Sequence, residues 1–156
     1  MEAGQAGVVA KRGYRLFVAA SVALLAVAGL HTLGHFSFEA PDAKGQAVLE
    51  QMQQYRVDAG LGQQPSLWDI QRSLSLTMAI LLAGIGLINL SIVAIAGDVP
   101  GVLRRLTMFG LLIVGSLVVL YGWYRVPPPF VTLFAVELLF VASLLVQRGA
   151  DPVRSL

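Results

Sequence analysis

The chain contains no cysteine, and only 13% of its 156 residues are charged. Without cysteine there is no disulfide framework, no thiolate metal site and no thiol redox chemistry. The chain has only two histidines, His31 and His35, so no second helix supplies a histidine for haem ligation across a bundle. The basic residues are divided among short segments and predict no continuous patch for nucleic acid.

Hydrophobic residues are abundant, at 56% of the chain with a mean hydropathy of +0.74. They form four long runs, at 14–34, 74–97, 106–123 and 130–146. Each run approaches the ~20 residues that a helix needs to cross ~30 Å of hydrocarbon. The sequence therefore predicts an all-α integral membrane protein.

Short links between the runs favour an antiparallel four-helix bundle that forms a single membrane domain over residues 1–156. The predicted spans are approximately 14–34, 72–97, 104–124 and 130–147, with a partly helical outer loop at 35–71. Pro127, Pro128 and Pro129 exclude a continuous helix between the last two spans.

Basic residues predict the orientation. Seven of the eleven fall on one side of the predicted spans: Lys11, Arg12, Arg15, Arg104, Arg105, Arg148 and Arg154. Because positive charge favours the cytoplasmic side, we expect a multi-pass protein of the plasma membrane with both termini in the cytoplasm.

The first run has a second interpretation as a cleavable signal peptide. Its basic stretch, Lys11 to Arg15, would precede an apolar region at 16–27 and a cleavage site at Ala26 to Ala28. Retention is favoured because apolar character continues to Leu33 and an uncleaved chain has four spans. Cleavage would place His31 near a new N-terminus and remove most of the site predicted below.

The outer loop carries signals for two helix starts. Asp42 is a predicted N-cap, and Ser66 with Asp69 forms a pattern like a capping box. Residues 58–64 are predicted to be a loop. Four apolar residues after Asp42 follow helical spacing and predict a short amphipathic helix: Val48, Leu49, Met52 and Tyr55.

The second span has one face of small and polar residues at intervals of three or four: Asp69, Arg72, Ser75, Ala79, Ala83, Gly86 and Asn89. Such a face allows close helix packing, and Asn89 is predicted to hydrogen-bond across the contact. Gly115 and Gly122 predict a similar contact surface in the third span.

Glu137 is the most unusual residue, because a carboxyl group about 10 Å below the membrane boundary must face protein or water. His31, near the end of the first span, is its first candidate partner, and His35 lies one turn further out on the same face. Trp68, Asp69 and Arg72 could cover a pocket above these residues.

Three interpretations of this group remain open. The residues could tie helices together through buried hydrogen bonds, or form an outward-facing polar pocket. The third interpretation is a metal site, since two histidines and Glu137 match a zinc ligand set in type, but the histidine spacing alone is weak and no HExxH motif accompanies it. Neither a metal nor a cofactor is therefore predicted.

Several residues resemble a known family. Gly29-Leu-His31-Thr32-Leu-Gly34, then Pro41, Val48 and Met52, then Ser66-Leu-Trp68-Asp69, are similar to a family of small bacterial membrane proteins with four predicted spans. The similarity covers roughly residues 15–90 and implies a bacterial plasma membrane, with interest in His31, Trp68 and Asp69. It implies no reaction. Ile70-Gln71-Arg72 departs from the family pattern, which has an aromatic pair there.

We expect a binding or accessory protein whose pocket holds an amphiphilic, lipid-like ligand at His31, His35, Trp68, Asp69, Arg72 and Glu137. One alternative is an acid/base enzyme, an isomerase or hydrolase of a lipid-like substrate, with Glu137 donating and His31 accepting a proton. Another is a purely structural subunit that binds a partner membrane protein. The expected partners are thus the lipid bilayer, a lipid-like molecule or another membrane protein, and not nucleic acid. Transport is disfavoured, since no inverted repeat is evident.

Overall fold

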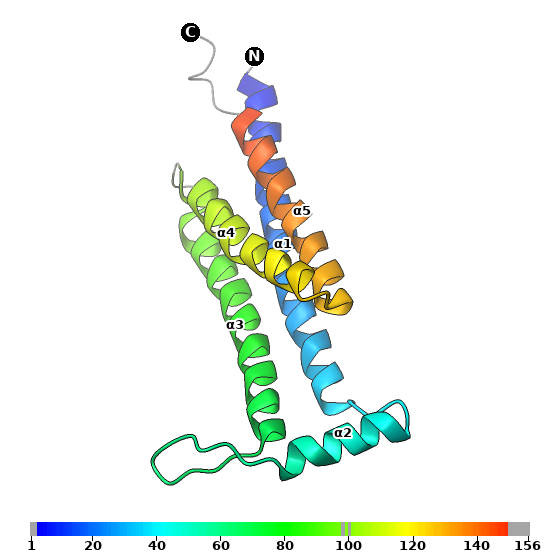
Figure 1. The fold of residues 1–156 in the computed structure, drawn as a ribbon. Helices are drawn as coiled ribbons and strands as arrows, with labels where there is room; N and C mark the ends of the chain where they lie inside the picture. Colours follow the sequence, from blue (N-terminus) through cyan, green and yellow to red (C-terminus); the bar gives the residue numbers. More distant parts are fainter. Residues whose placement is uncertain (1–2, 98, 100, 150–156) are drawn as a thin grey trace. The chain divides into compact units, whose positions relative to one another are not determined.

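The computed structural model describes residues 3–97, 99 and 101–149, and in these residues the chain is all-α (Figure 1). The elements are α1 (Ala3–Phe36), α2 (Ala43–Gln54), α3 (Leu67–Ala96), α4 (Val102–Trp123) and α5 (Pro127–Gly149). All except α2 contain a segment long and apolar enough to cross a membrane. The predicted fold class is confirmed, and the chain is a small multi-pass membrane protein. Asp98, Pro100 and Arg154 lie outside the described residues.

The proline-rich link between the last two spans was predicted to precede the fourth helix, which instead begins at Pro127. All three prolines belong to the first turn of α5. The first N–H groups of a helix have no partner within it, so the missing N–H of proline removes no hydrogen bond there. The predicted break is confirmed, because α4 ends at Trp123.

The helices form two compact units. Unit 1 comprises residues 1–27 and 84–156, and therefore the first part of α1, the last part of α3, α4 and α5. Unit 2 comprises residues 28–83, and therefore the end of α1, α2 and the first part of α3. The single membrane domain expected from the sequence stays a prediction.

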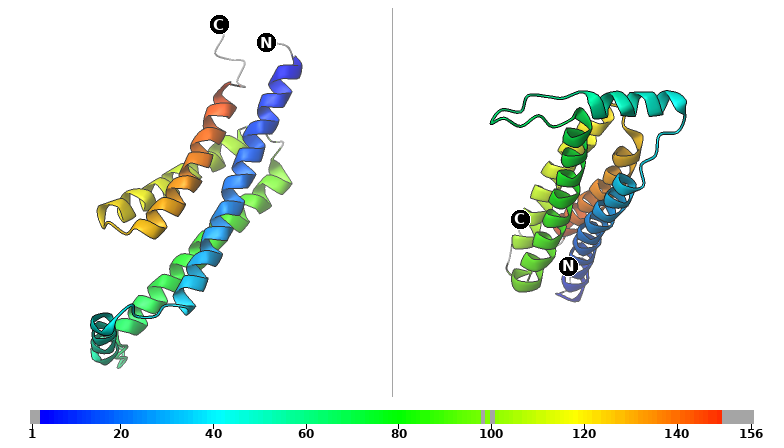
Figure 2. Two further views of the ribbon diagram at one scale, coloured as in Figure 1. Left: turned by 90° about the vertical axis from the view of Figure 1, so that its right-hand side faces the viewer. Right: turned by 90° about the horizontal axis from the view of Figure 1, so that it is seen from below.

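Unit 1 has an apolar core in which α4 and α5 lie side by side and antiparallel (Figure 2). Phe17 of α1 and Phe140 of α5 are fully buried and meet edge to face, with ring centroids 5.8 Å apart. A Cβ at Gly110 of α4 would lie 2.8 Å from the Phe140 ring. The missing side chain at Gly110 thus makes room for one of the two phenylalanine rings of the core.

Polar side chains join three helices of unit 1 near the chain termini. Gln147 Nε2 donates to Thr107 Oγ1 over 3.0 Å and to Ser143 Oγ over 2.9 Å. Ser143 Oγ in turn donates to the carbonyl oxygen of Gly13 over 2.8 Å. These hydrogen bonds connect α4, α5 and α1 inside an apolar surrounding, where few competing partners exist.

The predicted packing face of the second span is confirmed at Gly86, where a Cβ would lie 2.9 Å from the Ser21 carbonyl oxygen and from Leu25 Cδ2. The predicted hydrogen bond of Asn89 across this contact is not formed by its amide nitrogen. Asn89 is buried, but its Nδ2 has no hydrogen-bond partner among the described residues. Close backbone contact at the glycine, rather than the amide, holds α3 against α1 here.

In unit 2, α2 runs across the ends of α1 and α3 (Figures 1 and 2). The predicted N-cap is confirmed, since Asp42 Oδ1 accepts from the Gly45 N–H over 2.7 Å. The predicted loop after α2 is a short hairpin that the sequence did not reveal. Arg56 and Ser66 form an antiparallel bridge, and the Val57 N–H donates to the Pro65 carbonyl oxygen over 3.0 Å.

Candidate functional site

Four polar side chains of unit 2 meet between α1 and α3. Ser75 of α3 is their centre, because its Oγ lies 3.0 Å from His31 Nε2 and 3.1 Å from His35 Nδ1 of α1. Arg72, one turn before Ser75, donates from Nε to His35 Nε2 over 3.4 Å. The two histidines are four residues apart and therefore share one face of α1, as predicted. We call these four residues the His-Ser-Arg cluster.

The arginine determines the direction of the hydrogen bonds. A guanidinium group can only donate, so His35 Nε2 accepts and its ring proton is on Nδ1. His35 Nδ1 then donates to Ser75 Oγ, which leaves the Ser75 hydroxyl proton to donate to His31 Nε2. The result is a chain of donors that runs from Arg72 through His35 and Ser75 to His31.

His31 has a second oxygen within reach, because its Nε2 also lies 3.2 Å from the Ser75 carbonyl oxygen. With a proton on Nε2, the ring would donate to that carbonyl instead of accepting from the hydroxyl. His31 can therefore hold a hydrogen bond to Ser75 in either form. This ring is the most adaptable member of the cluster.

The cluster is open to ligands. His31, His35 and Ser75 are half-buried, and Arg72 is exposed. Arg72 forms no ion pair within the residues that the structure describes. A guanidinium that has no ion pair in the described residues, beside two imidazoles and a hydroxyl, offers donors and positive charge, a combination that suits an anionic group.

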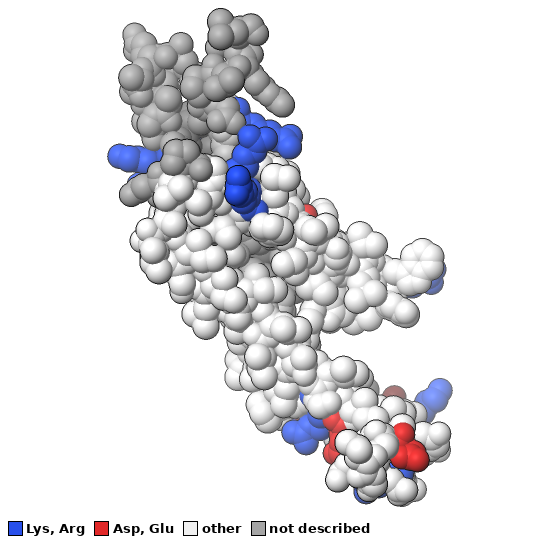
Figure 3. Space-filling view, turned by 90° about the vertical axis from the view of Figure 1, so that its left-hand side faces the viewer, with Lys and Arg blue, Asp and Glu red and all other residues white. Residues whose placement is uncertain are grey.

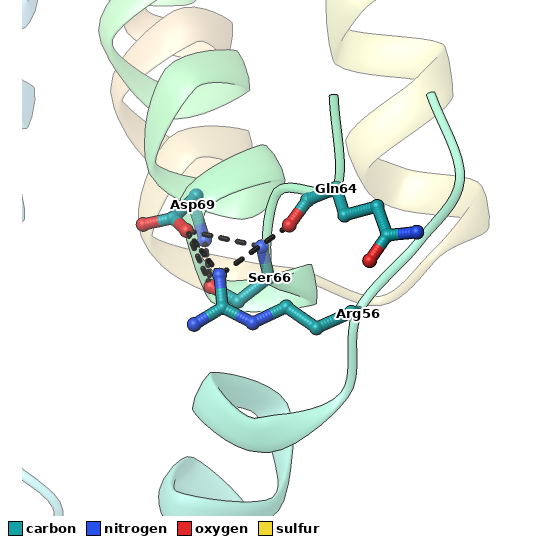
Figure 4. A network of polar contacts seen from close by, with 4 residues as sticks. All are labelled: Arg56, Gln64, Ser66 and Asp69. Atoms are coloured by element: carbon teal, nitrogen blue, oxygen red, sulfur yellow. Dashed lines mark hydrogen bonds and ion pairs between the residues drawn. The ribbon is translucent and has the colours of Figure 1, made fainter. Parts of the chain in front are cut away.

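Asp69 was predicted as a ligand-binding residue, but the structure gives it local partners (Figure 4). Its Oδ2 accepts from the Ser66 N–H over 3.0 Å and from Ser66 Oγ over 2.7 Å. The Asp69 N–H donates to Ser66 Oγ over 3.1 Å, which completes the predicted capping box. Arg56 lies 3.9 Å away as an exposed ion-pair partner. These contacts give Asp69 a clear structural role at the start of α3.

Trp68 packs against Phe38, with ring centroids 5.7 Å apart. An open groove of about 530 Å³ lies nearby, lined by Val48, Gln51, Met52, Gln54, Tyr55 and Leu67. Its apolar lining includes three of the four residues that predicted the amphipathic helix. This face of α2 is therefore only partly covered by other residues of unit 2. A covering role for Trp68 over a pocket stays a prediction.

Glu137 belongs to unit 1, whereas His31 belongs to unit 2, so their pairing stays a prediction. Within unit 1 the Glu137 carboxyl group packs against Gly115 of α4, where a Cβ would lie 3.0 Å from Oε1. Glu137 Oε2 is buried and has no hydrogen-bond partner among the described residues. The predicted contact surface at Gly115 is confirmed, and a carboxyl group is what it accommodates.

Sequence reasoning assigned Ser75 only to a packing face and missed its place in the site. The available signal was its position three residues after Arg72 on a face that also had to meet an adjacent helix. Histidines four residues apart on that helix can both reach one hydroxyl group, because side chains at this spacing are neighbours. No group of three or more metal-ligating side chains occurs in the described part of the chain.

Comparisons of the chain with protein-family models, with curated proteins and with solved structures gave no match. The four apolar helices identify a small four-span membrane protein.

Proposed function

We propose that this protein binds an amphiphile with an anionic headgroup through the His-Ser-Arg cluster. The observation that carries the proposal is the convergence of His31 and His35 on Ser75, with Arg72 on the outer side. Ionisable residues inside a membrane span, as His31 and His35 are, mark candidate functional sites by default. A phosphate or carboxylate of the ligand would receive hydrogen bonds from the cluster, with Arg72 as its positive charge.

The surroundings of the cluster suit the apolar part of such a ligand. His31 lies five residues before the end of α1, about 7.5 Å along the helix axis at 1.5 Å per residue. A headgroup would thus lie near the membrane boundary, with its chains directed into the hydrocarbon. Unit 2 offers large exposed apolar side chains on α1 and α3: Leu30, Leu33, Leu74, Ile80 and Leu81.

We further propose that the protein belongs to the bacterial plasma membrane, in the family of four-span proteins that it resembles, with both termini in the cytoplasm. The distribution of basic residues supports this orientation. Because the chain has no cysteine, single cysteines can test it directly. A thiol reagent that cannot cross membranes should label Lys44→Cys, and should label Val99→Cys only after the membrane is opened. The reverse pattern would contradict the orientation.

Native mass spectrometry tests the binding function. The full chain, extracted from its own membrane in a mild detergent, should retain an anionic amphiphile. Ser75→Ala and Arg72→Gln should lose it, because the first removes the hydroxyl that both histidines share and the second removes the positive charge of the cluster. Thr77→Ala is the matched control, since the Thr77 hydroxyl donates only to the Ser73 carbonyl oxygen of its own helix. Equal retention in all four proteins would contradict the proposal.

Hydrolysis of the bound amphiphile is the second candidate function. The 3.0 Å contact between Ser75 Oγ and His31 Nε2 has the length that a hydroxyl nucleophile and its base require. A fluorophosphonate probe should then label Ser75 in the wild type and not in His31→Gln. Absence of labelling in the folded wild type would exclude hydrolysis at Ser75 and leave binding as the proposed function.

A further inference from the structure

Five basic side chains of unit 1 are exposed near the helix ends: Lys11, Arg12, Arg15, Arg105 and Arg148. None of the five has a hydrogen bond or an ion pair within the described residues. Arg104 lies among them but has an interaction of its own and is not one of the five. The five positive charges are available to an external partner.

Helix contacts gather these charges at one end of unit 1. Gln147 of α5 donates to Thr107 of α4, and a Cβ at Gly13 of α1 would lie 2.9 Å from the Gln147 side chain. The end of α3 is also adjacent, because a Cβ at Gly97 would lie 3.4 Å from Tyr14. The start of the first candidate span at Lys11, the start of α4 and the ends of α3 and α5 thus meet. The basic residues look scattered in the sequence but share one end in the folded unit.

Negative charge does not balance this end. The described residues of unit 1 contain one carboxylate side chain, Glu137, which lies inside the span of α5. The complete sequence adds three acidic residues near these helix ends, Glu2, Asp98 and Asp151, against seven basic ones. Blue side chains gather at this end of unit 1 in Figure 3. We call it the basic end.

We propose that the basic end binds the phosphate groups of anionic membrane lipids. All five charges lie within a few turns of the ends of membrane spans, which is the depth of lipid headgroups. Anionic headgroups in the adjacent leaflet attract such juxtamembrane Lys and Arg residues. The preference of positive charge for the cytoplasmic side of a membrane explains why these residues share one side. It does not require that the ends of four spans come together there.

The site differs from the His-Ser-Arg cluster in its residues, its unit and the number of headgroups that it takes. It takes several lipid phosphates at an exposed surface, whereas the cluster takes one headgroup between two helices. Binding at the basic end should therefore weaken steeply as the salt concentration rises, because exposed charges are screened. Loss of the cluster should leave it unchanged.

The test measures binding of a short-chain phosphatidylglycerol to the full-length protein in an uncharged detergent, with Ser75→Ala and Arg72→Gln present in every protein compared so that the His-Ser-Arg cluster does not contribute. Each neutralised charge should weaken binding about fivefold, so a triple variant Arg12→Gln, Arg15→Gln, Arg105→Gln should lose a factor on the order of 100. The matched control replaces Lys44, Arg56 and Arg125, which lie outside the basic end, by Gln. It should bind as the wild type does. Size-exclusion chromatography and circular dichroism establish that both variants are folded.

Two further ligands distinguish an anionic lipid from a zwitterionic lipid and from free phosphate. Phosphatidylcholine of the same chain length and inorganic phosphate should both bind much more weakly than phosphatidylglycerol. Equal binding of phosphatidylcholine, or of inorganic phosphate, would overturn the proposal, as would an equal loss in the control variant. Should the triple variant fail to fold, salt dependence in the wild type decides: unchanged phosphatidylglycerol binding between low and high salt would refute it.

Discussion

The helices within unit 1 and the helices within unit 2 are held together by different interactions. The largest fully buried side chains of the described structure all belong to unit 1, among them Phe17, Leu24, Leu133 and Phe140. In unit 2 the contact between α1 and α3 includes a set of hydrogen bonds centred on Ser75. Unit 1 shows how close packing joins helices of this chain, and unit 2 shows polar groups placed where a ligand can reach them.

This difference has a physical basis. Lipid is as apolar as leucine, so helices in a membrane gain little from hiding apolar surface and depend on close packing and hydrogen bonds. Unit 1 uses glycines for close packing, as Gly110 does beside Phe140. Unit 2 uses half-buried polar groups, whose partners can be exchanged for those of a ligand. Stability and binding would therefore respond to different substitutions.

The largest loss of stability is expected from Phe140→Ala. It removes the ring that fills the space between Phe17 and Gly110, and a truncated buried aromatic residue lowers the free energy of unfolding by about 3 kcal/mol or more. Denaturation in mixed micelles measures this change. Phe109→Ala is the control, because Phe109 is 62% exposed on α4. A similar loss in both variants would contradict the packed core of unit 1.

A smaller loss is expected from Gly86→Ala. The new Cβ would meet the Ser21 carbonyl oxygen, which cannot move without α1, so we expect destabilisation of about 1–3 kcal/mol. Gly84→Ala, two residues earlier, meets no atom within 4 Å and should be neutral or slightly stabilising. The same micelle denaturation compares the two. If Gly84→Ala proved the more damaging variant, the contact of α3 with α1 in unit 1 would be misplaced.

Ser75→Ala should have a smaller effect on stability and a larger effect on binding. It leaves both histidines without their shared partner and should lower the free energy of unfolding by about 1 kcal/mol. Ser73→Ala is the control, since the Ser73 hydroxyl donates only to the Ile70 carbonyl oxygen. Hydrogen exchange should increase at the start of α3 only in Ser75→Ala. Identical exchange in the two variants would remove Ser75 from the centre of unit 2.

The smallest effect is expected from Arg56→Gln. Its ion pair with Asp69 is 3.9 Å long and exposed on both sides, so it contributes little to stability in water. Asp69→Asn should be more damaging, because the Asp69 carboxylate accepts two hydrogen bonds from Ser66 at the start of α3. Thermal unfolding followed by circular dichroism compares them. A larger loss in Arg56→Gln would show that the ion pair, not the cap, fixes this helix start.

Most of the fold could be predicted from local patterns. Apolar run length indicated the four long helices, and Asp42 and Ser66 with Asp69 indicated two helix starts, because caps depend on residues only three positions apart. The bridge of Arg56 with Ser66 could not be predicted in this way. It depends on a turn around Gly60 and Gly62, whose positive φ angles glycine allows but does not require.

The candidate site was only partly predictable. His31, His35 and Arg72 were recognised by their residue types, whereas Ser75 was assigned to packing, because a serine in an apolar helix does not reveal whether its partner is a backbone or a side chain. The error at Asn89 has the same origin. Its burial was predicted correctly, but a hydrogen bond also requires a partner at the right depth on another helix, and periodicity carries no such information.

The most direct test of the central claim uses the side-chain ¹⁵N spectrum of histidine, because the chain has only two histidines and both belong to the cluster. An alkyl phosphate added to the full-length protein in an alkyl maltoside of the same chain length should shift the signals of His31 and His35 together. The shift should disappear in Ser75→Ala and persist in Ser73→Ala. Histidine signals that stay unchanged while the alkyl phosphate binds would contradict a headgroup site at these residues.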